Sequence, residues 1–123
     1  LAAGSAIIGK VGIDQTTMGT TNAVVAPGSA YETVAASQTA QAMGATGATG
    51  DYLSHCIATP GTISPGVVTI LDNATAIVSF AGGASSVSNL IPFSIPVGAV
   101  SVSGAWKITT GANVTVVCVG KFT

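Results

Sequence analysis

Short apolar runs separated by turn residues dominate the chain from residue 51 onward. The runs are rich in β-branched residues, and Gly, Pro, Asp or Asn stands in most of the gaps between them. Their near-regular spacing predicts an antiparallel β-sandwich, jelly-roll-like, formed by residues 51–123. The runs are YLSHCIAT (52–59), GVVTILD (66–72), AIVSFAG (76–82), NLIPFSI (89–95), AVSVSG (99–104), AWKITT (105–110) and VTVVCVGKF (114–122).

The last run is apolar on both of its faces. A strand alternates its side chains between two faces, and a strand that is apolar on both is covered on both. In a domain this small we expect the second cover to be another subunit, with Val117 and Val119 at the contact. The two alternating sets are Val114, Val116 and Cys118 on one face and Thr115, Val117 and Val119 on the other.

Residues 1–28 differ in character and predict an extended N-terminal arm. Two short apolar runs, AIIGKVGI (6–13) and AVVA (23–26), flank a Thr-rich stretch. A two-stranded hairpin is marginal alone in water, so this arm is expected to dock onto its own domain or a neighbour. Strand addition is a plausible mode of docking. The candidate contacts are Ile7, Ile8, Val11, Ile13, Val24 and Val25.

Residues 29–50 connect the arm to the sandwich, and residues 29–43 allow two interpretations. Ser29 and Glu32 fit a helix capping box, with Gly44 as a C-terminal stop. Against a helix, YETVAAS (31–37) alternates as a strand does, and the apolar positions form no helical stripe. We favour strands, which would contribute edges to the sandwich. The tract GATGATG (44–50) predicts a loop.

Ionisable residues are scarce. Asp, Glu, Lys and Arg make up 6% of the chain, against roughly a quarter in typical soluble domains. Little electrostatic repulsion then keeps copies apart, which favours self-association. The three lysines (Lys10, Lys107 and Lys121) form no cluster, so nucleic acid is not an expected partner. No run approaches the roughly 18–20 apolar residues of a membrane-spanning helix, so a membrane is not expected either.

The sequence contains few residues suited to catalysis or to metal binding. We expect no enzyme, no cofactor and no metal site. His55 is the only histidine, and no G-x-S-x-G motif surrounds any serine. Neighbouring residues on a strand point to opposite faces, so His55 and Cys56 cannot readily share one ion. A structural role for His55 is therefore favoured. A catalytic Ser-His-Asp triad in this sequence would have to combine Ser54 or Ser64, His55, and Asp51 or Asp72.

The two cysteines, Cys56 and Cys118, each lie inside a predicted strand. They could face each other if the two strands were neighbours. Nothing in the sequence indicates an oxidising compartment, and a free cysteine behaves as a small buried hydrophobe. We expect reduced core thiols rather than a disulfide.

Trp106 is the best single candidate for a ligand contact. An exposed Trp beside Lys107 would suit a carbohydrate or a protein. The alternative is a core Trp that closes one end of the sandwich while Lys107 points outward. Period-2 alternation favours this second interpretation.

Several sequence segments of the chain resemble segments of structural proteins of tailed bacteriophages. The segment IGKVGIDQTTMGTTN (8–22) resembles one that recurs near the start of the folded part of many phage virion proteins, where the equivalent of Met18 is often Pro. Four later segments resemble a β-sandwich module of the same group. They are TGATGDYL (46–53), TISPGV (62–67), FAGGA (80–84) and SGAWKITTGAN (103–113).

The resemblance implies a virion structural protein, assembled in the host cytoplasm, of the capsid decoration or head-fibre type. Such proteins commonly form homotrimers and often use an extended arm. By analogy, residues 1–28 would bind the major capsid protein, another virion protein or a neighbouring subunit, while residues 51–123 would project. The alternative is a receptor-binding module of a tail fibre or spike, which predicts exposed clusters around Gly82–Asn89 or Trp106.

Overall fold

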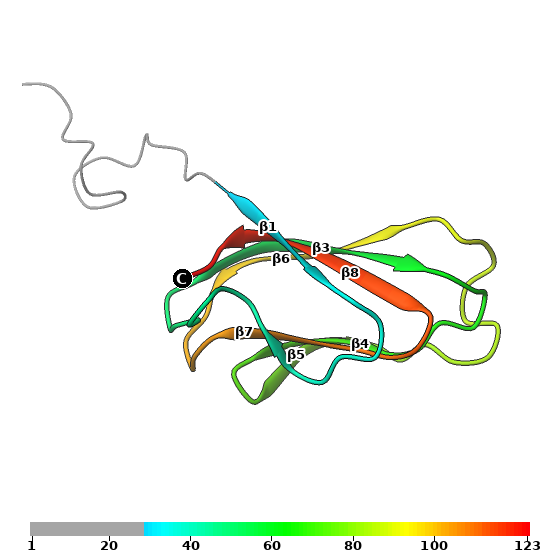
Figure 1. Cartoon of the computed structure of the whole chain (residues 1–123), viewed down its shortest axis with the longest axis horizontal. Helices are drawn as coiled ribbons and strands as arrows, with labels where there is room; N and C mark the ends of the chain where they lie inside the picture. Colours follow the sequence, from blue (N-terminus) through cyan, green and yellow to red (C-terminus); the bar gives the residue numbers. More distant parts are fainter. Residues whose placement is uncertain (1–28) are drawn as a thin grey trace, which may run out of the picture.

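The computed structural model describes residues 29–123, which form two four-stranded antiparallel sheets packed face to face (Figure 1). One sheet has the order β1-β8-β3-β6 and the other β2-β7-β4-β5. The predicted antiparallel β-sandwich is therefore confirmed. The strands are β1 (Ala30–Val34), β2 (Gln41–Ala42), β3 (Tyr52–Pro60), β4 (Val68–Asp72), β5 (Thr75–Phe80), β6 (Phe93–Val100), β7 (Trp106–Thr110) and β8 (Val114–Lys121).

The strand order is that of a jelly roll. Each strand in the first half of the chain pairs with its counterpart in the second half: β1 with β8, β2 with β7, β3 with β6 and β4 with β5. The chain thus runs as one long hairpin whose tip is the turn after Asp72, where Asn73 has a φ of 56°. Folding this hairpin over places alternate pairs in opposite sheets, and β3–β8 and β4–β7 pairing completes each sheet.

The core lies between the sheets and is filled by every second residue of the strands. In β8 the predicted alternation is confirmed, because Val114, Val116 and Cys118 are buried while the intervening residues face outward. Burying a large apolar side chain stabilises a fold by roughly 1.5–3 kcal/mol. The buried apolar residues are Val34, Met43, Leu53, Cys56, Ala58, Val68, Ile70, Ile95, Trp106, Ile108, Val114, Val116 and Cys118.

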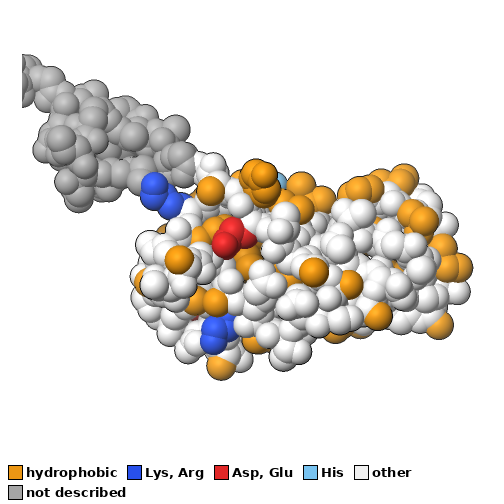
Figure 2. All heavy atoms as spheres, viewed as in Figure 1, with side chains coloured by type: hydrophobic (Ala, Val, Ile, Leu, Met, Phe, Trp, Pro, Cys, Tyr) orange, Lys and Arg blue, Asp and Glu red, His pale blue; other side chains and the backbone are white. Residues whose placement is uncertain are grey.

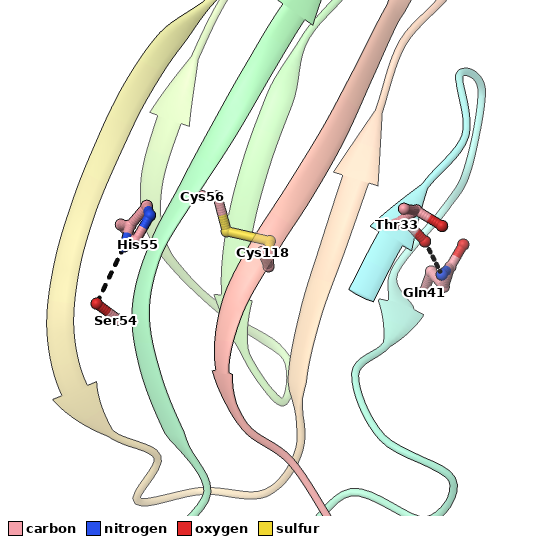
Figure 3. Close-up of a disulfide and its surroundings, with 6 residues drawn as sticks. All are labelled: Thr33, Gln41, Ser54, His55, Cys56 and Cys118. Atoms are coloured by element: carbon pink, nitrogen blue, oxygen red, sulfur yellow. Dashed lines mark hydrogen bonds between the residues drawn. A yellow bond between two sulfur atoms is a disulfide. The ribbon is translucent and has the colours of Figure 1, made fainter. Parts of the chain in front are cut away.

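The ambiguous stretch before residue 44 forms strands. β1 is an edge of one sheet and β2 is an edge of the other. The Glu32 carboxylate accepts a hydrogen bond from the main-chain N–H of Gly44 and caps no helix. The side-chain amide of Gln41 donates to the main-chain oxygen of Thr33 at 3.2 Å, which ties the two edges together (Figure 3).

The prediction of two separate strands at residues 89–95 and 99–104 is wrong. A single strand, β6, replaces them, and its neighbours 89–92 and 101–105 lie outside any strand. The Val–Ser alternation is also misleading here, because Ser101 is 2% exposed whereas Val102 is 76% exposed. Ser101 is buried because its hydroxyl donates to the oxygen of Ala48 and accepts from the N–H of Gly50. These two bonds satisfy the polar group that burial desolvates.

The expectation of reduced thiols is also wrong, because Cys56 and Cys118 form a disulfide (Figure 3). β3 and β8 are hydrogen-bonded neighbours, and the two cysteines stand directly opposite each other. Their Cα atoms are 4.0 Å apart, which is nearer to the roughly 4.5 Å of a non-hydrogen-bonded antiparallel pair than to the roughly 5.5 Å of a hydrogen-bonded one. The bond therefore joins the two central strands of one sheet.

Candidate interaction surfaces

The outer face of the β1-β8-β3-β6 sheet carries two rows of outward residues that contain no Asp, Glu or Lys. Register places these rows side by side across all four strands. Along the upper edge of Figure 2, over this sheet, hydrophobic side chains gather. We call this surface the apolar face. One row consists of Tyr31, Val119, His55 and Pro96. The adjacent row consists of Thr33, Val117, Ile57 and Ser94.

The centre of the apolar face is half-buried and its margins are exposed. Val117 and Val119, predicted as subunit contacts, lie on the central strand β8 and point outward. Tyr31, on the edge strand β1, is 70% exposed. Lys121 is the next outward residue on β8 after Val119, so one lysine borders the two rows on the same outer face. Five of the eight residues in the two rows are apolar, and an exposed patch of apolar side chains is a candidate protein–protein contact.

The outer face of the second sheet has a different chemistry. Its outward residues on β4 and β7 include Thr69, Leu71, Lys107 and Thr109. The Lys107 ammonium group donates to the side-chain oxygen of Asn73 at 3.2 Å. This outer face therefore mixes hydroxyl groups and aliphatic side chains with one charged side chain, Lys107.

The sheet edges are poorly suited to pairing with a further strand. On β1 the oxygen of Thr33 already accepts from Gln41. On β6 Pro96 lacks an N–H, and the register with β3 shifts between Leu53 and His55. β2 has two residues, and the pairing of β5 with β4 is interrupted between Ile70 and Leu71. Short, interrupted or Pro-containing edges resist strand addition.

Within residues 29–123, His55 lies on the apolar face and its ring contacts only one of the candidate residues named for a Ser-His-Asp set. Its Nδ1 is 3.0 Å from the hydroxyl of its neighbour Ser54 (Figure 3). The two candidate aspartates are engaged elsewhere, since Asp51 accepts from Ala48 and Thr123, and Asp72 from Val102 and Ser103. Ser64, in a distant loop, accepts from the N–H of Ser85. The structure places Ser54 beside His55, but neither candidate aspartate joins them.

No group of three or more His, Cys, Asp or Glu side chains that could hold a metal ion occurs in the described part of the chain. The two cysteines considered with His55 are committed to the disulfide and lie inside the core, whereas His55 points outward. Alternation on β3 separates His55 from Cys56, as the sequence predicts.

The hypothesis that Trp106 is an exposed ligand contact is wrong. Trp106 is 2% exposed, and its indole N–H donates to the main-chain oxygen of Asp51 at 2.8 Å. Lys107, the next residue, points to the outer side of its sheet and bonds Asn73. The alternative prediction, a core Trp106 with Lys107 pointing outward, agrees with both positions, because neighbouring residues on a strand point to opposite faces.

Three exposed aliphatic residues lie in two loops at the end of the sandwich opposite the C-terminus (Figure 1). Ile63 is 50% exposed, Leu90 50% and Ile91 64%. Hydrogen bonds hold the loops together, from the N–H of Val87 to the oxygen of Ile63 and from the N–H of Ser85 to the hydroxyl of Ser64. We call Ile63, Leu90 and Ile91 the loop cluster. Sequence reasoning missed it because Leu90 and Ile91 resemble strand residues, although Pro92 follows them directly.

The remaining candidate contacts lie outside the described residues. They are the arm positions Ile7, Ile8, Val11, Ile13, Val24 and Val25. Within residues 29–123, no helix has the length and apolar character needed to cross a membrane.

Comparison with known proteins finds no matching family model, no matching curated protein and no matching solved structure. The jelly roll occurs in viral capsid proteins, in lectins and in cupins, and a fold alone does not define a function.

Proposed function

We propose that this chain is a non-enzymatic structural protein of a tailed-phage virion, of the capsid decoration or head-fibre type, and that it works as a homotrimer. The observation that carries the proposal is the apolar face, an exposed sheet surface without Asp, Glu or Lys in its two rows. The phage-like sequence segments and the occurrence of jelly rolls in viral capsids support the same class.

In this proposal the chain acts by burying surface and carries out no bond chemistry. Residues 1–28 bind the major capsid protein, another virion protein or a neighbouring subunit, and the sandwich projects from the particle. The protein assembles in the host cytoplasm and ends in an extracellular particle. Extracellular surroundings are oxidising, so the Cys56–Cys118 disulfide suits that destination.

Electron microscopy of the particle that carries this chain tests the proposal. Density that fits the jelly roll at three-fold or quasi-three-fold positions of the capsid is the expected result. Density found only at the tail would overturn it and would support the alternative below. Antibody labelling of the same particles provides an independent position for the chain.

The loop cluster favours a second candidate, a receptor-binding module of a phage tail fibre or spike. Ile63, Leu90 and Ile91 present apolar side chains on mutually hydrogen-bonded loops, and jelly rolls also serve as lectins. Purified protein should then bind host cells or their surface polysaccharide. The double variant Leu90→Ser/Ile91→Ser should lose that binding, whereas Ile77→Ser, at a 48% exposed site on β5, should keep it. Absence of binding by the unchanged protein would contradict this candidate.

A further inference from the structure

We propose that residues 6–14 of the same molecule cover the apolar face in the free chain. The N-terminal segment enters the sandwich beside this face, because β1 is an edge strand of its sheet and Ala30 pairs with Gly120. The proposal goes beyond the proposed function, since it concerns the chain before it meets any partner. Binding of residues 1–28 to a virion protein or a neighbouring subunit would then uncover the face. The sequence of the covering segment is AIIGKVGID.

The small size of the apolar face favours an occupant that is tethered to it. Strands lie about 4.8 Å apart and outward residues of one strand about 6.8 Å apart, so two rows across four strands span about 260 Å². Two such faces would bury about 520 Å² together, well short of the roughly 1,200 Å² of a specific contact between separate molecules. A tethered segment meets its site at an effective concentration on the order of millimolar, so a weak contact is sufficient to hold it.

The chain between the segment and β1 is long enough for the segment to return to the face. Asp14 precedes Ala30 by 16 residues, and an unstructured chain of that length has a root-mean-square end-to-end distance of about 22 Å. The edge strands β1 and β6 are three strand spacings, or about 14 Å, apart. An extended run of eight residues is about 26 Å long, which is sufficient to follow β8 over the roughly 20 Å from Lys121 to Thr115.

The alternation of residues gives the covering segment one apolar side. In an extended chain Ile7, Val11 and Ile13 point to one side, whereas Lys10 and Asp14 point to the other. The first side suits the apolar rows of the sheet, and the second leaves both charged groups in water. Burial of the three aliphatic side chains is therefore the main source of affinity in this contact.

Charge complementarity gives the direction in which the segment lies. Lys121 borders the rows at the end of β8 that adjoins the start of β1. The three acids among residues 29–123 already accept hydrogen bonds from main-chain N–H groups, namely Glu32, Asp51 and Asp72. The remaining acid of the chain is Asp14, which directly follows the apolar run. Asp14 then lies beside Lys121 at the rim of the face, and the run extends from there along β8. Such a rim pair sets orientation more than affinity.

A photo-crosslinking amino acid in place of Thr33, in the full chain, tests the proposal. Thr33 lies in one of the two rows and is exposed. Unlabelled and ¹⁵N-labelled chains are mixed before irradiation, and the crosslinked peptides are identified by mass spectrometry. The expected product joins position 33 to residues 6–14 with a single label, which shows that both peptides come from one copy. The same amino acid at Thr69, on the outer side of β4, is the control and should give no such product.

Variants of the segment test which of its sides makes the contact. Val11→Ser/Ile13→Ser should lower the crosslink yield at least about 10-fold, because two aliphatic side chains no longer gain from burial. Ile8→Ser is the matched control, since it makes the same kind of change on the side that carries Lys10 and Asp14, and it should leave the yield unchanged. Circular dichroism of each variant verifies the fold.

A charge exchange tests the direction of the segment. Asp14→Lys and Lys121→Asp should each lower the crosslink yield about two- to five-fold, the range of an exposed ion pair. The double variant Asp14→Lys/Lys121→Asp should restore it. Asp14→Lys combined with Lys107→Asp, which places the new carboxylate on the opposite sheet, should not.

The outcomes separate this proposal from the proposed function. Absence of a crosslink from position 33 to residues 6–14, or a crosslink to residues 15–28 in its place, would overturn the assigned segment. A product that carries mixed labels would show that a second copy covers the face, which overturns the proposal while supporting self-association. Failure of the double charge variant to restore the yield would overturn the placement of Asp14 beside Lys121. The position of the chain on the particle, seen by electron microscopy, tests the proposed function independently of these results.

Discussion

The indole N–H of Trp106 donates a 2.8 Å hydrogen bond to the main-chain oxygen of Asp51. Trp106 begins β7 in one sheet, and Asp51 directly precedes β3 in the other. The bond therefore links the two sheets at one end of the sandwich. The Asp51 carboxylate bonds Thr123 as well, so the same residue also fixes the C-terminal segment.

Truncation of this link should be costly. Trp106→Ala removes a 2% exposed aromatic side chain and should lower the free energy of unfolding by about 3–5 kcal/mol. Trp106→Phe keeps part of the packing and should cost about half as much, because Asp51 still accepts from the N–H of Ser101. Urea unfolding followed by circular dichroism measures both. Ile91→Ala, at a 64% exposed site, should change stability by less than about 0.5 kcal/mol.

The chain has one tryptophan, which makes the burial of Trp106 directly testable. Native fluorescence should resist quenching by acrylamide, and unfolding in urea should remove that resistance. Strong quenching of the native protein would contradict the core position of Trp106 and return it to the candidate ligand contacts.

Asp72 holds the segment that follows β6. Its carboxylate, in a residue 4% exposed, accepts from the main-chain N–H groups of Val102 and Ser103. Asp72→Ala leaves both donors unpaired and should lower the free energy of unfolding by about 2–3 kcal/mol. Asp72→Asn retains one acceptor oxygen and should recover part of that loss. Chemical denaturation of the two variants gives the comparison, and equal losses would contradict a role through these hydrogen bonds.

The disulfide should make a large contribution to stability. The cysteines are separated by 62 residues, and closing a loop of that length stabilises a fold by about 4 kcal/mol in the chain-entropy model. Cys56→Ala/Cys118→Ala should lose stability on that scale, and reductant should weaken the unchanged protein but not the double variant. Thiol titration of the denatured, unreduced protein should find no free thiol. Two free thiols would show that the bond does not form.

Two glycines pack backbone against backbone where the loops after β3 and β7 meet. A Cβ built on Gly66 would lie 2.6 Å from the Cα of Gly111, and the reverse is equally close. Gly66→Ala should therefore lower the free energy of unfolding by about 1–3 kcal/mol. Gly61→Ala is the matched control in the same loop, since its nearest neighbour would be the oxygen of Asn113 at 3.5 Å. Thermal unfolding distinguishes the two variants.

Much of the fold follows from local patterns in the sequence. The β-branched runs and turn residues predicted the strands at β3, β4, β5, β7 and β8, and the alternation along β8 predicted which side chains are buried. These features depend on the period-2 geometry of a strand, which any extended segment obeys. The same geometry predicted that Lys107 faces away from the core while Trp106 faces into it.

Contacts between residues far apart in sequence explain why the predictions for Ser101 and for the two cysteines were wrong. Ser101 is buried because residues 48–51, far away in sequence, supply its hydrogen-bond partners. The two cysteines are bonded because β3 and β8 are neighbours, a pairing that closes 62 residues of chain. The local alternation of apolar and polar residues cannot predict such partners, because the pairing of strands far apart in sequence depends on the topology of the fold.

The amino-acid sequence by itself determined the all-β class and the shortage of charge. It also determined that Val117 and Val119 form a second apolar set on β8, because composition and period are local properties. Only the tertiary structure placed Tyr31, His55, Ile57 and Pro96 beside them on one face. Those residues come from three other strands, and the register that aligns them is set by hydrogen bonding between segments far apart in the chain.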